Sequence, residues 1–338
     1  MNPLKIVLIV LMLLTINIDA KDYTKKREVR NFITKMVKKY HFKRAYLNKL
    51  FKDVEFQQRA LGIFNPKYAK RPKKRPKRYP KHGSWDRYEK IHLGETRVDK
   101  GVEYLRKHRE IFRRAYRKYG VPPEYITAII GIESYYGVNV GQFPAFDTLT
   151  TLGFEENRRS KYFRYELKNL LLLSKANKFN PKNVKSSFAG AIGLGQFMPS
   201  SYYYVVDFNG DGKKSMQTTA DAIAGIANYF KKNGWRKGEP VATRVRYEGN
   251  RFTAKKTGYN HIYTRSSLKN ISPMYEEWNY WKKVRLIKLD RKYYDELWYG
   301  AKNFYVITRY NHSGYYAMAI HQLAKRIRHK YWKKYGRF

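Results

Sequence analysis

Hydrophobic residues recur every three or four positions along most of the chain, which is the spacing of one buried face of an α-helix. Within residues 27–56, two such stripes lie opposite faces rich in Lys and Arg. A third stripe, from Val102 to Tyr116, predicts a helix ending at Gly120, and a fourth predicts a helix that starts at Pro123 and stops at Gly137. Further helices are predicted over residues 163–176, over 219–233, where Thr219 suits the N-cap, and over 315–331.

Residues 235–300 have a different pattern, in which Val, Tyr and Phe alternate with polar residues between turn-forming segments. The predicted fold class is therefore mainly α, in the α+β sense, with a small β-containing subdomain. The stretch Ser187–Pro199 is rich in glycine, but no βαβ unit surrounds it as a dinucleotide site would require. We interpret its glycines as points of close packing against helices.

Composition and breaks in the pattern divide the chain into six segments. Lys5 and the apolar run from Ile6 to Ile16 precede Ala20, which is typical of a cleaved secretory signal rather than a membrane anchor. Residues 66–82 hold four prolines, nine Lys or Arg and no acid, so they predict either a polyanion-binding arm or a hydrophilic spacer. The predicted segments are a signal peptide (1–20), an N-terminal helical segment packing on the core (21–65), a basic Pro-rich linker (66–84), a helical core (85–234), a β-containing subdomain (235–300) and a C-terminal segment completing the core (301–338).

The charge of the chain is strongly unbalanced. Its 338 residues include 71 Lys or Arg against 27 Asp or Glu, giving a formal net charge of +44. Such a charge predicts a polyanionic partner, which could be nucleic acid, an acidic membrane surface or an acidic polymer such as a cell wall. The signal pattern implies export and argues against nucleic acid. Because the chain has no cysteine, disulfides, thiolate metal sites, a cysteine nucleophile and lipid attachment to a cysteine are excluded.

Glu133 combines a carboxylate with a hydrophobic helix face. It follows Ile126, Ile129 and Ile130 by seven, four and three residues, so it shares their face. Burial there and the negative end of the helix dipole both disfavour the ionised form. A carboxylic acid that stays protonated near neutral pH can donate a proton to a glycosidic leaving group. The alternative is a helix-end glutamate that pairs with one of the many Lys and Arg residues.

A second catalytic carboxylate is not evident near Glu133. Asp147, Glu155 and Glu156 follow in the sequence, but each is equally well explained as a helix cap or a surface charge. Ordinary glycoside hydrolysis uses two carboxylates. A single strong candidate therefore suggests that the substrate itself supplies the nucleophile.

Residues 207–212 match the start of a calcium-binding loop. Asp207, Asn209 and Asp211 occupy ligand positions 1, 3 and 5. Gly210 follows Asn209, and Gly212 follows Asp211 at position 6, where the motif has a glycine. Thr218 stands at position 12, where the motif requires a glutamate, and Asp221 could supply the missing carboxylate. The alternative is an Asx-rich turn without a metal.

Taken together, several ordered blocks resemble the membrane-bound lytic murein transglycosylase B family, from about residue 30 to 325. The blocks are Gly131-Ile132-Glu133-Ser134-Tyr135-Tyr136-Gly137, Arg158-Arg159, the run 187–201 and Tyr310-Asn311-His312-Ser313. The resemblance implies a lysozyme-like fold and cleavage of the β-1,4 bond between N-acetylmuramic acid and N-acetylglucosamine. It further implies a 1,6-anhydromuramoyl product, formed with no catalytic cofactor.

The resemblance also implies roles for particular residues. Glu133 would be the single acid and base. Substrate would be bound by Tyr88, Arg158, Arg159, Ser187, Gln196, Tyr310, Asn311 and Tyr316, with the two arginines meeting peptide-stem carboxylates. A structural calcium ion would be held by Asp207, Asn209, Asp211, Lys213 and Asp221.

We therefore predict a secreted lytic murein transglycosylase. Its partners would be peptidoglycan glycan strands, with acidic peptide stems or a membrane surface contacted through the basic segments. We expect a periplasmic monomer with no membrane span after signal cleavage and no nucleic-acid ligand. The alternatives are a muramidase that uses water as nucleophile and a non-catalytic basic scaffold that binds the cell wall.

Overall fold

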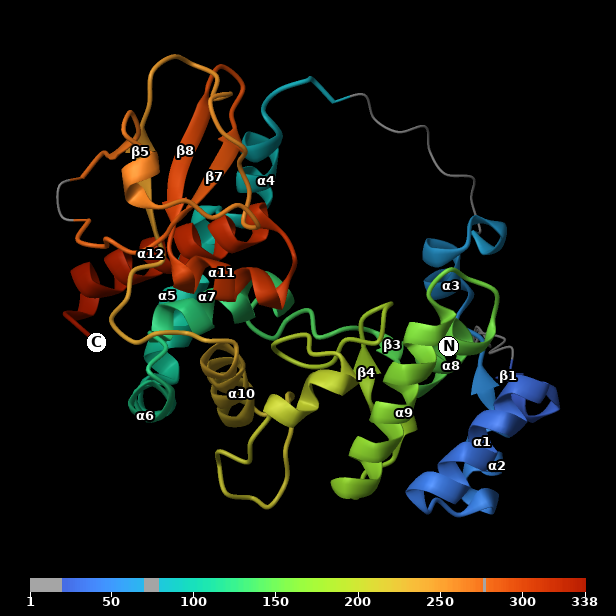
Figure 1. Cartoon of the computed structure of the whole chain (residues 1–338). Coiled ribbons are helices and arrows are strands. Elements are labelled where there is room, and N and C mark those ends of the chain that lie inside the picture. Colours follow the sequence, from blue (N-terminus) through green and yellow to red (C-terminus); the bar gives the residue numbers. More distant parts are fainter. Residues whose placement is uncertain (1–19, 70–78, 276–277) are drawn as a thin grey trace, which may run out of the picture.

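A computed structural model describes residues 20–69, 79–275 and 278–338 of the chain (Figure 1). The predicted signal peptide up to residue 19 and the middle of the basic Pro-rich segment lie outside the described residues. The described helices are α1 (Arg27–Tyr40), α2 (Arg44–Lys52), α3 (Gln58–Phe64), α4 (Ser84–His92), α5 (Glu95–Lys107), α6 (Arg109–Tyr119), α7 (Pro123–Ser134), α8 (Ala145–Phe154), α9 (Ser160–Ala176), α10 (Thr219–Lys232), α11 (Lys302–Tyr310) and α12 (Gly314–Tyr335).

Strands are few and lie mainly in one sheet. The strands are β1 (Ala20–Lys21), β2 (Val54–Glu55), β3 (Phe143–Pro144), β4 (Lys185–Ser186), β5 (Ala242–Arg246), β6 (Ser272–Pro273), β7 (Arg285–Asp290) and β8 (Asp295–Gly300). The last four form an antiparallel sheet in the order β6-β5-β8-β7, while the others make two short pairs. This confirms the prediction of a mainly helical fold with a small β portion.

The sheet packs on both of its faces. Successive residues of a strand point to opposite faces. Leu286 of β7 accordingly joins a small hydrophobic cluster within the sheet region, whereas Ile287 and Leu289 join the main hydrophobic core. The sheet is thereby attached to the helices beside α4 and α12 (Figure 1).

The main core is built around α7, most of whose residues are buried. Helices α5, α6, α10 and α12 pack against it. As predicted, Pro123 takes the first helical position, where its missing N–H leaves no hydrogen bond unmade. None of the described helices is both long and apolar enough to cross a bilayer.

The N-terminal helices pack against α8 and α9. The Phe51 ring of α2 lies 5.1 Å from that of Phe146 in α8, and the Phe32 ring of α1 lies 5.6 Å from that of Phe154. The carboxylate of Glu155 accepts a 2.8 Å hydrogen bond from the Tyr23 hydroxyl. These contacts join residues 20–65 to the same hydrophobic core as α7.

Several predicted helix boundaries were wrong, including the start of α9, which is Ser160 rather than residue 163, and the end of α12, which is Tyr335 rather than residue 331. The helix predicted from Val102 to Gly120 is in fact two helices separated at His108. The sequence did not reveal this break, because Phe112 follows Leu105 by seven positions and so continues the same hydrophobic stripe. Helix α7 ends at Ser134 rather than at Gly137, since Tyr135 already adopts the left-handed conformation with φ 50°. Thr219 is the first helical residue of α10, and the N-cap is Thr218.

Candidate active site

Glu133 is the next-to-last residue of α7. It is half-buried, whereas Ile126, Ile129 and Ile130 on the same helix are fully buried. Gly131 allows the chain after the helix to fold back, because a side chain there would collide with the Tyr136 ring, whose hydroxyl donates a 2.7 Å hydrogen bond to the Arg97 carbonyl. The motif around Glu133 thus places its carboxyl group at an accessible end of a rigid helix.

Tyr316 holds one oxygen of this carboxyl group. Its hydroxyl donates a 2.6 Å hydrogen bond to Oε1 of Glu133. Tyr316 lies in the first turn of α12, where the N-cap Ser313 accepts a hydrogen bond from its backbone N–H. The two partners are 183 residues apart in the sequence, so the packing of α12 on α7 creates the pair.

A second contact fixes α12 against α7. The buried Tyr125 hydroxyl and Nδ1 of His321 are 2.8 Å apart, and burial lowers the pKa of His321 to about 3. The histidine is therefore neutral at physiological pH. Sequence analysis missed this pair, because nothing near either residue indicates a partner 196 positions away. The pair stabilises the two helices that carry Glu133 and Tyr316.

Burial raises the pKa of the carboxyl and hydroxyl groups at the site. Burial raises the pKa of Glu133 to about 7, and the Tyr316 hydrogen bond opposes that rise by favouring the carboxylate. The direction agrees with the prediction of an acid whose protonated form is favoured, and the catalytic role of Glu133 stays a prediction. Burial and the nearby Glu133 charge raise the pKa values of Tyr310 and Tyr316 well above the ordinary range, so both remain hydroxyl donors.

Aromatic side chains surround the Glu133–Tyr316 pair. The Tyr310 ring lies parallel to that of Tyr316, with centroids 6.5 Å apart, and its hydroxyl donates a 2.5 Å hydrogen bond to the Gly195 carbonyl. Burial and the charge of Glu133 raise the pKa of Tyr88, which places Tyr88 near the carboxyl group. The structure thus brings three of the predicted tyrosines to Glu133.

Tyr88 is held by residues that sequence analysis did not single out. Its ring packs against Trp85 at 5.9 Å and against Tyr315 at 5.8 Å. The Tyr315 hydroxyl is 2.8 Å from Oγ of Ser84 and accepts a 3.1 Å hydrogen bond from the backbone N–H of Asp290. These contacts join α4, α12 and the sheet beside the site.

The glycine-rich loop approaches the end of α7. A side chain at Gly137 would lie 2.9 Å from Leu194 of that loop, and one at Gly195 would lie 2.8 Å from the Tyr310 hydroxyl. These distances confirm that the glycines permit close packing. The Gln196 side-chain amide donates to the carbonyls of Val140 and Gly193 at 3.2 and 2.9 Å, which orients its own carbonyl oxygen. Ser187 turns its hydroxyl to the backbone, where it accepts from Ala191 N–H at 3.1 Å.

Of the predicted substrate-binding residues, Tyr316 is the one that hydrogen-bonds to Glu133 within the described part of the chain. Three others are exposed at the surface. Arg158 and Arg159 are exposed at the turn between α8 and α9, and Arg159 lies over the Tyr162 ring at 4.5 Å. Asn311 is exposed at the end of α11, next to Tyr310. Their predicted roles stay predictions.

The nearby acids of the sequence have other partners. Asp147 is buried beside Lys182 at 3.7 Å, and burial raises its pKa to about 6. Glu155 forms a buried ion pair with Lys26 rather than acting as a cap or surface charge, while Glu156 is exposed and lies 3.6 Å from Lys67. Among the described residues, no second carboxylate hydrogen-bonds to Glu133 or shifts its pKa.

The loop at residues 207–213 has the donors that calcium prefers. Asp207 and Asp211 supply carboxylates and Asn209 an amide oxygen, while Gly210 and Gly212 take positive φ values that let the backbone wrap around them. The side chain of Lys213 is a cation, so its predicted role as a ligand would require its backbone carbonyl; its N–H donates a 2.8 Å hydrogen bond to Asp211. These oxygen donors fit a calcium ion, although no group of three or more acidic, His or Cys side chains gathers anywhere in the described ranges.

Asp221 closes this loop. It is fully buried, and its two carboxylate oxygens accept hydrogen bonds from Phe208 N–H at 2.8 Å and Ser215 N–H at 2.9 Å. The carboxylate thus ties together the two ends of the loop from the first turn of α10.

A helical core, a half-buried glutamic acid and its tyrosine partner define the class of lysozyme-like enzymes that cleave glycans. The family model described as "Transglycosylase SLT domain" matches residues 24–325, and the chain belongs to this family of lytic transglycosylases, lyases that act on peptidoglycan. The chain is 37% identical over 312 residues to membrane-bound lytic murein transglycosylase B of Escherichia coli strain K12, covering 90% of this chain and 84% of the relative.

Solved structures agree with this assignment. The Escherichia coli lytic transglycosylase Slt35 in complex with bulgecin A has a TM-score of 0.81 and 37% identity, covering 91% of this chain and 94% of that chain. The same Escherichia coli protein in complex with calcium also gives a TM-score of 0.81, at 36% identity and the same coverage of both chains. The lysozyme-like fold predicted from the sequence is confirmed.

Proposed function

We propose that Glu133 alone serves as acid and base in the cleavage of the β-1,4 bond between N-acetylmuramic acid and N-acetylglucosamine. Its protonated carboxyl group donates a proton to the glycosidic oxygen as the bond from that oxygen to C1 breaks. The resulting carboxylate takes the proton of the muramoyl 6-hydroxyl, whose oxygen bonds to C1. The ring closes as a 1,6-anhydro sugar, Glu133 is again protonated, and no water is consumed.

The observation that carries this proposal is geometric: Glu133 lies half-buried at the end of α7, and Tyr316 hydrogen-bonds to one oxygen of its carboxyl group. Burial raises the pKa of this group to about 7. A group with a pKa near the working pH can both give and take a proton. The hydrogen bond from Tyr316 occupies Oε1 and leaves Oε2 for the substrate. We further propose that Tyr88, Gln196, Tyr310 and Asn311 contact the sugars and that Ser187 shapes the loop beside them.

The products distinguish this mechanism from hydrolysis. We expect digestion of purified cell-wall sacculi to release muropeptides whose muramoyl ends are one water lighter than reducing ends, because no described carboxylate is placed to activate water. Mass spectrometry of the released fragments, before and after borohydride reduction, makes the comparison. Fragments with reducing ends alone would instead indicate a muramidase.

We also propose that residues 207–221 bind a structural calcium ion, with Asp207, Asn209, Asp211 and the Lys213 carbonyl as ligands and Asp221 holding the loop ends. Bound calcium would stabilise the folded state by mass action. We expect 1 mM calcium to raise the melting temperature of the chelator-treated protein by about 3–6 °C. An Asp207→Asn/Asp211→Asn variant should lose the shift, and an unchanged melting temperature in the unmodified protein would contradict the site.

We propose that the enzyme acts in the periplasm, associated with the wall or a membrane through its charge. The apolar pattern before Ala20 and the formal charge of +44 support this location. Positively charged surface would keep the enzyme near carboxylates of the peptide stems, where its substrate is concentrated.

A further inference from the structure

A groove lies between the N-terminal helices and the end of α9. Three hollows of about 570, 300 and 540 Å³ all include Asn180 in their walls, so they adjoin one another around this residue. The walls of the groove come from residues 41–53, 173–184 and 213–217 together with Ile192 and Tyr202. We call this groove the lysine groove. It lies at the end of the molecule away from the β5–β8 sheet (Figure 1).

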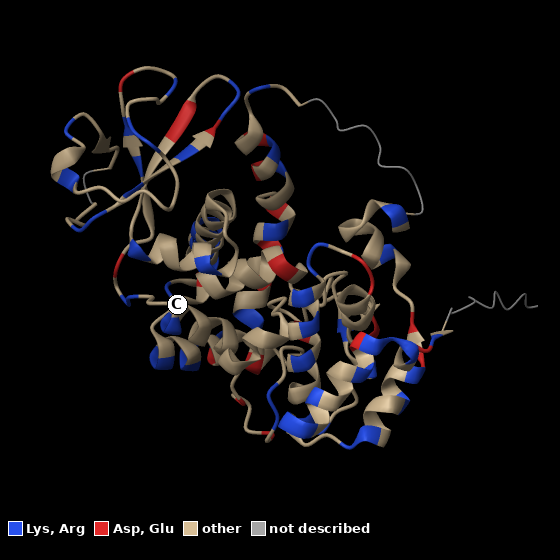
Figure 2. Cartoon of the chain, turned by 45° about the vertical axis from the view of Figure 1, so that its right-hand side comes forward, with Lys and Arg blue, Asp and Glu red and all other residues tan. Residues whose placement is uncertain are grey.

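The charge of the lysine groove is almost entirely positive. The lysines in its walls that form no ion pair with any described residue are Lys43, Lys49, Lys52, Lys175, Lys178, Lys213 and Lys214. Asp53 is the one acid among the wall residues, and it lies 3.6 Å from Lys182. Figure 2 shows the same concentration of Lys and Arg on the N-terminal helices. Like charges gathered along a concave wall attract an anionic chain.

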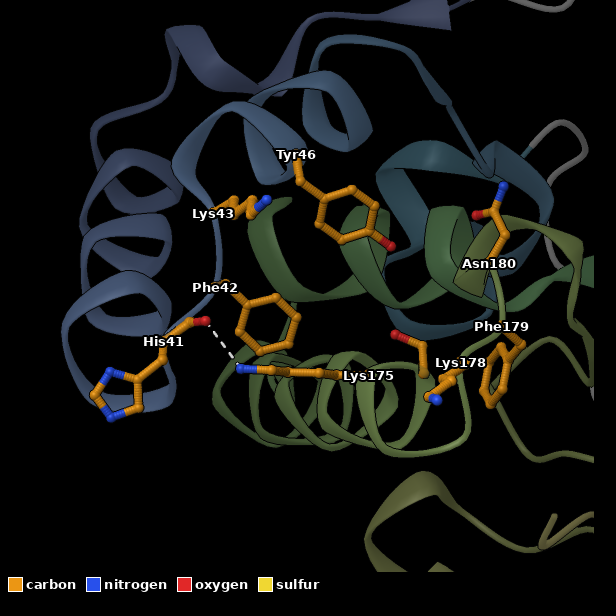
Figure 3. A pocket seen from close by; sticks show the side chains of 9 residues that line it. His41, Phe42, Lys43, Tyr46, Lys175, Lys178, Phe179 and Asn180 are labelled. Carbon is orange, nitrogen blue, oxygen red and sulfur yellow. Dashed lines mark hydrogen bonds between the residues drawn. The ribbon is translucent and has the colours of Figure 1, made fainter. Parts of the chain in front are cut away.

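Aromatic rings lie among these lysines. Phe42 from the loop between α1 and α2, Tyr46 from α2 and Phe179 from the segment after α9 line the first hollow, where Phe42 lies against Lys175 of α9 (Figure 3). The Lys175 ammonium donates to the Tyr40 and His41 carbonyls, both at 2.9 Å, and lies 5.0 Å from the Phe42 ring centre. This lysine thereby holds the two sides of the hollow together.

The rings differ in how far a ligand can reach them: Phe42 is only 7% exposed, Phe179 is half-buried, and Tyr46 is exposed. Tyr46 is 39% exposed although it lines two of the three hollows. An exposed aromatic face can stack on the C–H face of a sugar ring, while the neighbouring ammonium groups pair with carboxylates. The wall chemistry therefore suits a polymer that carries both sugars and carboxylates.

The lysine groove is separate from the site around Glu133. Its walls belong to the loop between α1 and α2, to α2, to α9 and to segments that follow α9, whereas Glu133 and Tyr316 lie on α7 and α12. No hydrogen bond joins a wall residue to Glu133 or Tyr316 in the part of the chain that the structure describes. An occupant of the groove would contact the enzyme without entering the cleavage site.

We propose that the lysine groove binds a second stretch of peptidoglycan, whose stem carboxylates pair with the lysines and whose sugars stack on the aromatic rings. This inference rests on the proposed function, because it names a further contact with the same substrate. A concave groove with aromatic walls fits a polymer segment better than the flat surface of a bilayer. The contact would keep the enzyme on the wall between cleavage events.

The test compares a groove variant with a control of equal charge. Lys43→Gln/Lys49→Gln/Lys214→Gln removes one charge from each hollow, and Lys255→Gln/Lys256→Gln/Lys269→Gln removes three exposed charges from the β-containing region. Each triple is combined with Glu133→Gln, so that sedimentation with purified sacculi measures binding without turnover. We expect the groove triple to weaken binding about five- to tenfold and the control triple to weaken it less than twofold.

Two further measurements make the result specific. Tyr46→Ala, which leaves the charge unchanged, should weaken sacculus binding about threefold, since it removes a stacking face. With Glu133 restored, the groove triple should lower the ratio of activity on sacculi to activity on a soluble disaccharide–tetrapeptide dimer by about fivefold. At 0.5 M salt the groove triple and the unmodified protein should give similar ratios, because salt screens the ion pairs between the groove lysines and the stem carboxylates in the unmodified protein.

Other outcomes would overturn the proposal. Equal binding of the groove and control triples to sacculi would mean that only net charge matters. Loss of binding to phosphatidylglycerol vesicles with unchanged binding to sacculi would assign the groove to a membrane. Failure of the proposed function is distinguished by the soluble substrate, since a Glu133→Gln protein that still cleaved it would contradict the catalytic assignment and leave the binding result intact.

Discussion

Replacing Glu133 with Gln should lower kcat at least about a thousandfold, with little change in sacculus binding. The side-chain amide can still accept the Tyr316 hydrogen bond, but it can neither donate a proton to the leaving oxygen nor take one from the 6-hydroxyl. General acid–base catalysis contributes roughly 10²–10⁴-fold per group, and here one group serves both steps. Release of muropeptides from sacculi, followed by chromatography, measures the loss.

Glu103→Gln provides the matched control. Glu103 is an exposed glutamate on α5 with no ion-pair partner among the described residues, so its loss should change the rate less than twofold. Retention of a tenth or more of the activity by Glu133→Gln would mean that another group supplies the proton.

The Glu133→Gln variant should also be more stable than the unmodified protein at alkaline pH. The pKa of Glu133 is raised from 4.5 in the unfolded chain to about 7 in the folded protein. The protonated side chain therefore makes its full contribution to the free energy of unfolding below pH 4.5, and this contribution is lost as the pH rises through 7. Glutamine does not ionise and avoids that loss, which is worth up to about 3 kcal/mol when each pKa unit counts 1.36 kcal/mol. Thermal melts at pH 5 and pH 8 should show the larger gain at pH 8.

Replacing Tyr316 with Phe should lower kcat by roughly ten- to a hundredfold and move the alkaline limb of the rate profile upward. In the unmodified enzyme that limb should fall near pH 7, as the acid form of Glu133 is lost. The Tyr316 hydroxyl stabilises the carboxylate, so its removal raises the pKa of Glu133 further, by about one unit for one lost hydrogen bond. The rate falls because the carboxyl group loses its fixed orientation.

The pH profile separates this effect from a merely structural one. Tyr335→Phe, near the end of α12 and away from Glu133, should leave both the rate and the alkaline limb unchanged. A Tyr316→Phe enzyme with a lower rate and an unmoved alkaline limb would contradict the assigned hydrogen bond. A downward shift would contradict the sign of its effect on Glu133.

Some of the fold was not predictable from hydrophobic spacing. Helix α8 went unpredicted because all of its residues from Ala145 to Phe154 are buried, so the segment has no polar face to reveal a period. The break at His108 was hidden for the opposite reason, since the stripe continues in phase on both sides of it. The left-handed turn at Tyr135 was missed because glycine, not tyrosine, is the usual residue there.

Some features of the candidate site could likewise be predicted from the sequence, and others could not. Glu133, its place on the isoleucine face and the direction of its pKa could be predicted, because all three depend on residues within one helix. The contribution of Tyr316 came only from family resemblance, and the packing of Tyr125 against His321 was not anticipated at all. That Arg158, Arg159 and Asn311 are exposed could not be inferred from their order in the chain.

The large positive charge was evident from composition, but its arrangement was not. The lysine groove joins residues 41–53, 173–184 and 213–217, each of which reads as an ordinary basic or polar stretch by itself. Local patterns along the chain determined the mainly helical class, the acid at the end of α7 and the oxygen-rich loop at Asp207. Only tertiary packing decided which distant residues meet, because such contacts depend on how helices stack rather than on what stands next in the sequence.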